Sequence, residues 1–269
     1  MVDSELFEQY QAALGVNADL VKQCVENLVK QHSGNLTKKE LREIYVALVQ
    51  KFGTISAQVA LEFYEKVREQ AEVEDDYQPI AFIPDNAGLL AWDAATATQN
   101  QLAGMAVQRV MQYADETIYG NGAADPAKPK FAIVPHPGAC GWCLMVGGWG
   151  WNYNTRTTAN SQRHPNCKCT VVAEFDTRNP KLKGYDNVVY QDLWAAAQNR
   201  VDENELYREW SAMTPEQQRK YKRRYHRNKL GAESVATSQF DVFKRNRIIS
   251  ELTNHKDEIK RGIRLDELI

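Results

Sequence analysis

A cluster of cysteine and histidine residues in the middle of the chain constrains its fold more than any other feature. Cys140 and Cys143 form a Cys-x-x-Cys pair, and after twenty further residues the chain reads His164-x-x-Cys167-x-Cys169. Two thiolates at this spacing can bind one metal ion from a tight turn, and the second stretch offers further ligands at similar spacing. Because the chain has 5 cysteines, an odd number, the pattern favours a metal site over a disulfide framework.

We expect the cluster to bind zinc in a structural site, which would stabilise a loop-rich segment with little apolar content. Zinc takes four protein ligands, and five are available: Cys140, Cys143, His164, Cys167 and Cys169. One of Cys167 and Cys169 is therefore expected to stay outside the coordination shell. Two alternatives are a metal-free group of reduced cysteines packed against aromatic rings, and a redox pair of Cys140 and Cys143.

The remaining residues of this type have simpler interpretations. Cys24 falls on the apolar face of a predicted helix, where we expect a small buried side chain. Aromatic residues crowd the interval between the two ligand pairs: Trp142, Trp149, Trp151 and Tyr153. We expect them to cover the metal and pack a small core, with stacking on nucleic acid as the alternative.

Apolar residues at three- and four-residue spacing predict helices over 4–14, 18–32, 38–52 and 55–71, followed by an alanine-rich helical block over 86–118. Thr37 and Glu40 form a capping-box pattern, and Gly53 is expected to end the helix that begins there. Acidic residues and two prolines over 72–85 indicate a linker. Residues 1–118 are thus predicted to form a helical N-terminal region.

The rest of the chain divides in two. Residues 119–180 hold the Cys/His cluster with short strands expected at 131–134 and 170–175, and residues 181–269 return to helical periodicity with a basic character. The predicted fold class is mainly α: a helical N-terminal region, a small zinc-stabilised α+β module with a Cys/His-rich loop and short strands, and a helical C-terminal region.

Composition indicates a globular, intracellular chain. It has 43% hydrophobic and 25% charged residues, no secretory pattern at its start and no uninterrupted apolar run of the length that crosses a membrane. The net charge of −2 hides an asymmetry, because residues 1–130 carry 19 acidic and 11 basic side chains and the remainder carries 16 and 22. The basic part could face an anionic partner, although a chance asymmetry on a solvated surface explains the counts equally well.

Basic residues concentrate after Thr214, whose capping-box pattern predicts a helix start. Four of them share one face of that helix and are the candidate nucleic-acid-binding residues: Arg219, Lys222, Arg223 and Arg227. The alternative is a solvated helix whose tyrosines, Tyr221 and Tyr225, pack inward.

The chain lacks the sequence patterns of common enzymes. Gly-x-Ser-x-Gly, the Walker phosphate loop and His-Glu-x-x-His are absent, and the Cys-x-x-Cys pair lacks the preceding proline and upstream His-x-Glu of zinc deaminases. A site filled by four or five protein ligands also tends to be closed to water. We therefore predict no catalytic residues and no enzyme activity; the alternative is a zinc-containing nucleic-acid-binding enzyme such as a nuclease.

Over roughly residues 85–180 the sequence resembles the Mu F-like minor head proteins of tailed bacteriophages, the phage head morphogenesis family. The resemblance is carried by Cys140-Gly-Trp-Cys143 and by His164-Pro-Asn-Cys-Lys-Cys169 running into an apolar strand, after a mostly helical N-terminal part.

This resemblance implies a role in assembly. Such proteins enter the head in a few copies and contact the portal protein, so the implied partners are the portal, capsid or scaffold proteins and the packaged double-stranded DNA, with no membrane. The implied location is the interior of the virion head, after assembly in the host cytoplasm, where the protein would aid head assembly, DNA packaging or delivery.

Overall fold

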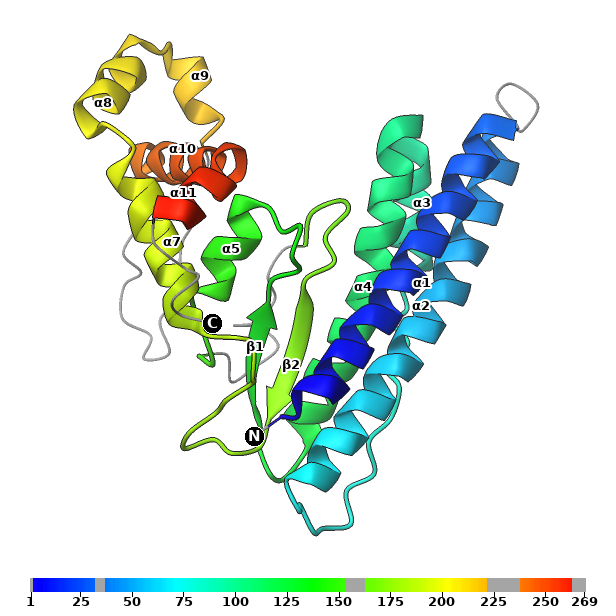
Figure 1. Ribbon diagram of the computed structural model, residues 1–269. Helices are drawn as coiled ribbons and strands as arrows, with labels where there is room; N and C mark the ends of the chain where they lie inside the picture. The colour runs from blue at the N-terminus through cyan, green and yellow to red at the C-terminus, as the bar shows by residue number, and fades with distance from the viewer. Residues whose placement is uncertain (1, 32–36, 153–162, 222–237, 263–269) are drawn as a thin grey trace. The chain divides into compact units, whose positions relative to one another are not determined.

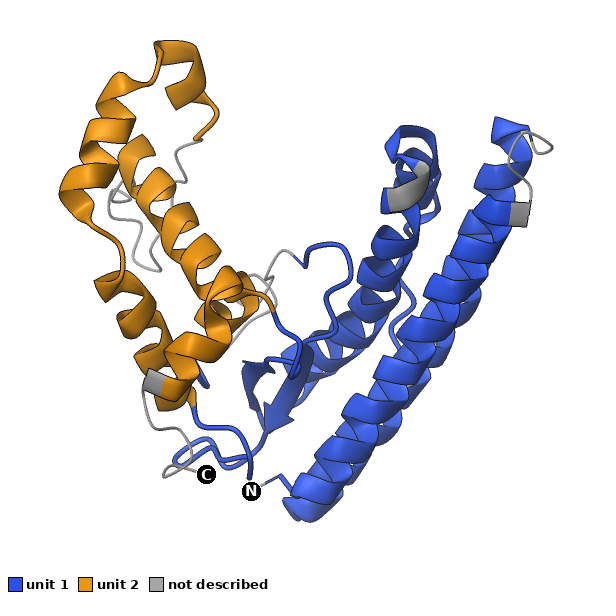
Figure 2. Ribbon diagram, turned by 45° about the horizontal axis from the view of Figure 1, so that its top comes forward, with its two compact units in different colours: residues 1–139, 149–186 blue, residues 140–148, 187–269 orange. Residues whose placement is uncertain are grey.

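The computed structural model describes residues 2–31, 37–152, 163–221 and 238–262. Within these ranges the chain is mainly helical, with one two-stranded antiparallel sheet and the Cys/His cluster in the middle of the sequence, as the composition and periodicity predict. The chain forms two compact units (Figure 2). The first comprises residues 1–139 and 149–186, and the second comprises residues 140–148 and 187–269.

The first unit is built on three long helices that pack against one another, a short fourth helix and the sheet (Figure 1). Its elements are α1 (Ser4–Gln31), α2 (Lys38–Gln70), α3 (Ala87–Thr96), α4 (Gln99–Ala124), β1 (Lys130–Val134) and β2 (Thr170–Glu174). The core between the long helices contains fully buried aromatic rings, among them Tyr45, Tyr64 and Tyr113. Burial of such large rings accounts for much of the stability of a helical bundle.

Side-chain caps set where these helices begin. The Thr37 hydroxyl accepts from the Glu40 amide at 3.2 Å while the Glu40 carboxylate accepts from the Thr37 amide at 2.8 Å, which confirms the predicted capping box of α2. Thr98 and Gln101 form a second box at the start of α4. Both boxes satisfy backbone donors that a helix end leaves without partners.

The sequence predicted a break between the helices of residues 4–14 and 18–32 and another between those of residues 38–52 and 55–71. Both breaks are wrong, because α1 and α2 are continuous. Gly53 does not end a helix: it lies in the interior of α2, where a Cβ atom would stand 2.7 Å from ring carbons of Tyr113. The residue is small because two helices approach closely there, and the surrounding packing overrides its low helix propensity.

The helical block predicted over 86–118 consists of the two helices α3 and α4, and α4 continues to Ala124. It passes through Gly120 and Gly122. A Cβ atom on Gly120 would stand 2.7 Å from the Phe82 ring, and one on Gly122 would overlap the Phe131 ring. These glycines mark close approaches of other segments to the helix and do not terminate it.

Residues between α2 and α3 form no helix, and hydrogen bonds hold them against α4. Asn121 is the main contact: its side chain accepts from the Ile80 amide at 2.9 Å and donates to the Ile80 carbonyl at 2.8 Å. The Tyr77 hydroxyl also donates to Asn121 Oδ1 at 2.9 Å. Asn121 is fully buried, so these bonds replace the water that its amide would otherwise require.

The two predicted strands are present and pair antiparallel, with Lys130 opposite Glu174 and Val134 opposite Thr170. Every residue of β2 is buried, including the polar residues Thr170 and Glu174 at its two ends. β2 also contacts α4, so the strand that follows Cys169 belongs to the core of the first unit.

The second unit is entirely helical within the described residues. It contains α5 (Gly141–Gly147), α7 (Asn187–Asn199), α8 (Glu203–Ala212), α9 (Pro215–Arg219), α10 (Gln239–Asn254) and α11 (Lys256–Gly262). α10 is central, since it contacts α5, α7, α8, α9 and α11. Trp210, Tyr221 and Phe243 form an aromatic cluster, with the Tyr221 and Phe243 rings 5.1 Å apart.

Among the described residues, α2 alone has the length and apolar composition that would let a helix cross a membrane. Those two properties are shared by core helices of soluble bundles. The buried side chains of α2 lie where the helix packs against α1 and α4.

Candidate metal centre

Cys140 and Cys143 lie at the start of α5. Cys140 is the N-cap residue, with extended backbone angles, and Cys143 is buried one turn into the helix. Gly141 lies between them because the helix start is pressed against α10: a Cβ atom there would overlap the Ile249 carbonyl oxygen. The Gly141 amide donates to the Thr253 hydroxyl at 2.9 Å, which orients the Cys-x-x-Cys turn within the second unit.

The second group of candidate ligands lies in a tight turn of the first unit. The Cys167 amide donates to the His164 carbonyl at 3.1 Å, and Asn166 has a positive φ of 63°, a conformation that Asn adopts more readily than most residues. The Asn166 amide donates to the Gly104 carbonyl on α4 at 2.9 Å. A Cβ atom on Gly104 would stand 2.6 Å from the Asn166 side chain, so this glycine allows the turn to reach the helix.

The five side chains form two overlapping groups of ligand atoms. The atoms of Cys140, Cys143 and His164 all lie within 4.8 Å of one another, and so do the sulfur atoms of Cys143, Cys167 and Cys169. In a tetrahedral site with zinc–sulfur bonds of about 2.3 Å, ligand atoms are about 3.8 Å apart, so this spacing suits such an ion. Cys143 belongs to both groups.

Most of the sulfur atoms of the cluster are buried. Cys143, Cys167 and Cys169 are 5%, 5% and 2% exposed, whereas Cys140 and His164 are half-buried. Neighbouring buried thiolates repel one another and are poorly solvated, and a bound metal ion removes both costs. The donor set is therefore consistent with zinc.

A buried ion pair adjoins the cluster and was not predicted from the sequence. Arg163 donates from Nε and Nη2 to the two carboxylate oxygens of Asp115 on α4, and from Nη1 to Cys167 Sγ at 3.6 Å. Burial raises the pKa of the Asp115 carboxyl to about 6, while the Arg163 guanidinium acts to lower it. Asp115 and Glu116 are the only acidic residues in the sequence of α4, and this was the signal that could have drawn attention to Asp115.

The aromatic residues near the cluster in the sequence do not share one environment. Trp142 is half-buried and lies under the Arg245 guanidinium, 6.0 Å from ring centre to cation, and the Trp151 ring lies 6.0 Å from that of Tyr185. Trp149 is 43% exposed, and Tyr153 is outside the described residues. Cys24 is half-buried in α1 and belongs to neither ligand group.

Only one of the candidate nucleic-acid-binding residues falls in the described part of the chain. Arg219 is exposed at the end of α9, and Lys222, Arg223 and Arg227 are outside the described residues. The capping box of Thr214 is confirmed, but the helix ends at Arg219. Tyr221 packs inward against Trp210 and Phe243, which is the alternative considered for this residue.

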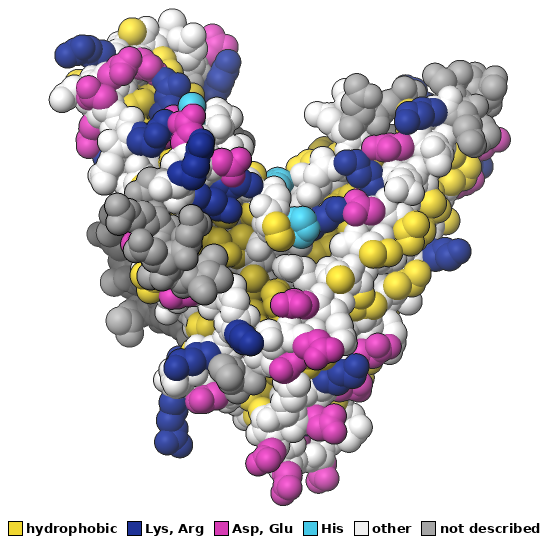
Figure 3. All heavy atoms as spheres, in the orientation of Figure 1, with side chains coloured by type: hydrophobic (Ala, Val, Ile, Leu, Met, Phe, Trp, Pro, Cys, Tyr) yellow, Lys and Arg dark blue, Asp and Glu magenta, His cyan; other side chains and the backbone are white. Residues whose placement is uncertain are grey.

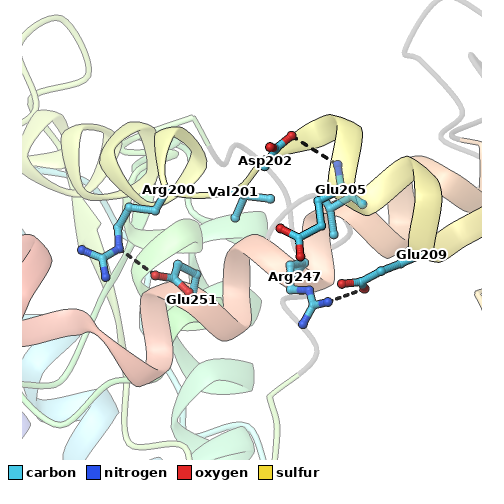
Figure 4. A pocket seen from close by; sticks show the side chains of 8 residues that line it. Arg200, Val201, Asp202, Glu205, Glu209, Arg247 and Glu251 are labelled. Carbon is cyan, nitrogen blue, oxygen red and sulfur yellow. Dashed lines mark hydrogen bonds and ion pairs between the residues drawn. The ribbon is translucent and has the colours of Figure 1, made fainter.

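A polar pocket in the second unit is lined mainly by charged residues of α8, of α10 and of the turn between α7 and α8 (Figure 4). Its arginines are already paired: Arg200 Nε donates to Glu251 at 2.7 Å, and Arg247 donates to Glu209. The Asp202 carboxylate caps α8 by accepting from two backbone amides. Both arginines of the pocket are thus already engaged by carboxylates.

Comparison with known proteins decides the family. A family profile, described as VG15 protein, matches residues 1–197, which include all five candidate ligands. The chain belongs to the VG15 family. This is a family of phage proteins, so the chain is a phage protein associated with the virion or the host cell. No curated protein and no solved structure matches the chain significantly.

Proposed function

We propose that this VG15 chain is a minor head protein of a tailed bacteriophage, with a structural zinc site, that aids head assembly, DNA packaging or delivery. The observation that carries the proposal is the convergence of four cysteines and one histidine within a match to a phage protein family. The same residues carry the resemblance to the Mu F-like head morphogenesis proteins.

The zinc site is proposed to be structural. Cys140, Cys143, His164 and one of Cys167 and Cys169 would hold the ion, and their sulfur and nitrogen atoms are the donors that zinc prefers. Bound zinc would supply a closed cross-link between two stretches of the chain. Four protein ligands leave no open position for an attacking water, so we propose no enzymatic role.

The proposed protein partners are the portal protein and capsid or scaffold proteins. Support comes from the first unit, where hydrophobic side chains lie exposed along the two long helices (Figure 3). They include Val16 and Leu20 on α1 and Ile55 on α2, which are 61%, 46% and 43% exposed. Apolar side chains grouped on a surface are typical of protein-binding sites.

The packaged double-stranded DNA is the proposed partner of the basic C-terminal region, in the interior of the head. Arg219 is exposed and has the charge for a phosphate contact, and the segment that follows it contains Lys222, Arg223 and Arg227. Contacts of this type would be independent of sequence and strongly dependent on salt.

Mass spectrometry of purified virions and of empty heads tests the proposal. The chain should be present in both at a few copies for each head, and it should be retained by immobilised portal protein in a binding assay. Absence from both particles would contradict the assembly role. If the purified chain instead degrades DNA over time in a metal-dependent manner, a nuclease is the better assignment.

A further inference from the structure

We propose that Arg163 is a positioning residue for the metal centre: its guanidinium, held by Asp115, donates a hydrogen bond to the Cys167 thiolate and so tunes the donor strength of that sulfur. The inference rests on the proposed zinc site and includes the assignment of Cys167, in place of Cys169, as its fourth ligand. It concerns three side chains of the first unit: Asp115 on α4, and Arg163 and Cys167 in the turn of residues 163–169.

Hydrogen bonds to α4 fix the backbone on both sides of His164, including that of Arg163. Gln108 on α4 donates from its side chain to the Arg163 carbonyl at 2.5 Å, and the Asn166 amide donates to the Gly104 carbonyl at 2.9 Å. The turn is therefore tied to the helix on both sides of His164. These hydrogen bonds restrict the positions that the guanidinium can reach, although the arginine side chain is long and flexible.

The guanidinium uses its donors in two directions. Its Nε and Nη2 edge is occupied by both oxygens of Asp115, and Nη1 lies on the opposite side, 3.6 Å from Cys167 Sγ. A planar guanidinium bound at one edge keeps its remaining donors in a fixed orientation. Asp115 therefore determines where Nη1 points.

Burial shields this contact from water. The Arg163 side chain is only 3% exposed and Cys167 is 5% exposed, so the N–H group has little access to water. A thiolate is a much better acceptor for a cationic donor than a neutral thiol. The guanidinium is thus directed at the sulfur atom that would bind the metal ion.

Partners of this kind commonly change metal affinity by about 10–100-fold when they are removed. We expect Arg163→Met to lower zinc affinity by about this factor in the full-length protein, measured by competition with a chromophoric chelator. In the cobalt(II)-substituted protein the sulfur-to-cobalt charge-transfer band should move to longer wavelength, because a sulfur without the hydrogen bond is the stronger electron donor.

The chain contains a matched control. Arg109, also on α4, binds both oxygens of Asp93 at 2.6 and 3.0 Å, and its remaining nitrogen donates to Gln112 at 3.0 Å instead of to a sulfur. Arg109→Met removes a comparable buried ion pair. It should lower stability but leave both the charge-transfer band and zinc affinity as in the wild-type protein.

The outcomes separate the two proposals. A wild-type protein that binds neither zinc nor cobalt overturns the metal centre and this inference with it. A wild-type protein that binds the ions, together with an Arg163→Met variant of unchanged band and affinity, overturns the role of Arg163 alone. If Arg163→Met does not fold, Arg163→Lys decides the question, because lysine keeps the charge but lacks the second donor edge. The charge-transfer band of the cobalt(II) protein should then shift in the same direction by a smaller amount. An unchanged band overturns the inference.

Discussion

Gly53 in the middle of α2 lies against the ring of Tyr113 on α4, so closely that a Cβ atom at residue 53 would stand 2.7 Å from ring carbons. The ring cannot easily retreat, because Tyr113 is fully buried and its hydroxyl donates to Asn86 at 3.0 Å. The contact between two residues sixty positions apart explains why a glycine occupies the interior of a long helix.

Gly53→Ala should therefore lower the free energy of unfolding by about 1–3 kcal/mol, in spite of the better helix propensity of alanine. The matched control is Gly15→Ala in α1, where no atom lies within 4 Å of the added Cβ. That variant should gain about 0.5–1 kcal/mol. Urea unfolding followed by circular dichroism measures both, and equal effects of the two substitutions would contradict the packing argument.

Asp125 should be critical to the stability of the first unit. It is fully buried and accepts from Arg68 Nε at 2.7 Å and from the Tyr64 hydroxyl at 2.9 Å. Asp125→Ala leaves much of the buried Arg68 charge uncompensated, which typically costs about 3–5 kcal/mol. Asp75 is the control, because it also pairs with Arg68 but is 27% exposed, so Asp75→Ala should cost below about 1 kcal/mol. Thermal unfolding distinguishes the two variants, and a larger destabilisation by Asp75→Ala would be inconsistent with the structure.

The start of α2 should depend on pH through Glu40. The Thr37 hydroxyl and amide donate to its carboxylate and lower the Glu40 pKa from its ordinary value. Because the folded-state pKa lies below that of the unfolded chain, the capping contribution is present at neutral pH and is lost as the pH falls through the folded-state pKa. An NMR titration of the Glu40 carboxyl carbon measures this shift. Thr37→Ala should return the pKa toward its ordinary value, and no change in that variant would refute the capping effect.

Zinc content should differ between variants of different cysteines. Cys143 belongs to both ligand groups, so Cys143→Ser should abolish the binding of about one zinc ion per chain expected from elemental analysis. Cys24→Ser in α1 is the control and should keep the zinc of the wild-type protein. Chelation of the wild-type ion should make residues near 140–169 more sensitive to proteolysis. Full zinc content in Cys143→Ser would contradict the proposed centre.

DNA binding by the basic segment should weaken with salt. Alanine at all four candidate positions should reduce the slope of log K against log salt by up to about 0.9 for each phosphate that the variant no longer neutralises. These positions are Arg219, Lys222, Arg223 and Arg227. The control removes the same charge from four exposed residues of α2: Lys38, Lys39, Arg42 and Lys51. Fluorescence anisotropy with duplex DNA measures both variants, and an equal weakening in the control would show that only net charge matters.

Local signals in the sequence predicted much of the fold. The capping boxes of Thr37 and Thr214 and the strands of residues 130–134 and 170–174 were recognisable because they depend on neighbouring residues or on short apolar runs. The candidate ligands were recognisable for a similar reason, since metal binding requires particular residue types at short spacing. Which of Cys167 and Cys169 binds the ion, the division into domains and the binding partners stay predictions.

The amino-acid sequence by itself thus determined a mainly helical chain with a small sheet and a clustered set of soft metal ligands, because periodicity, caps and ligand spacing are short-range properties. Only the tertiary structure decided that Gly53 continues a helix, that Gly120 and Gly122 accept the rings of Phe82 and Phe131, and that Asp115 holds Arg163 beside Cys167. The physical reason is that steric fit and buried charge pairing depend on which distant residues come together, and no local pattern specifies those neighbours.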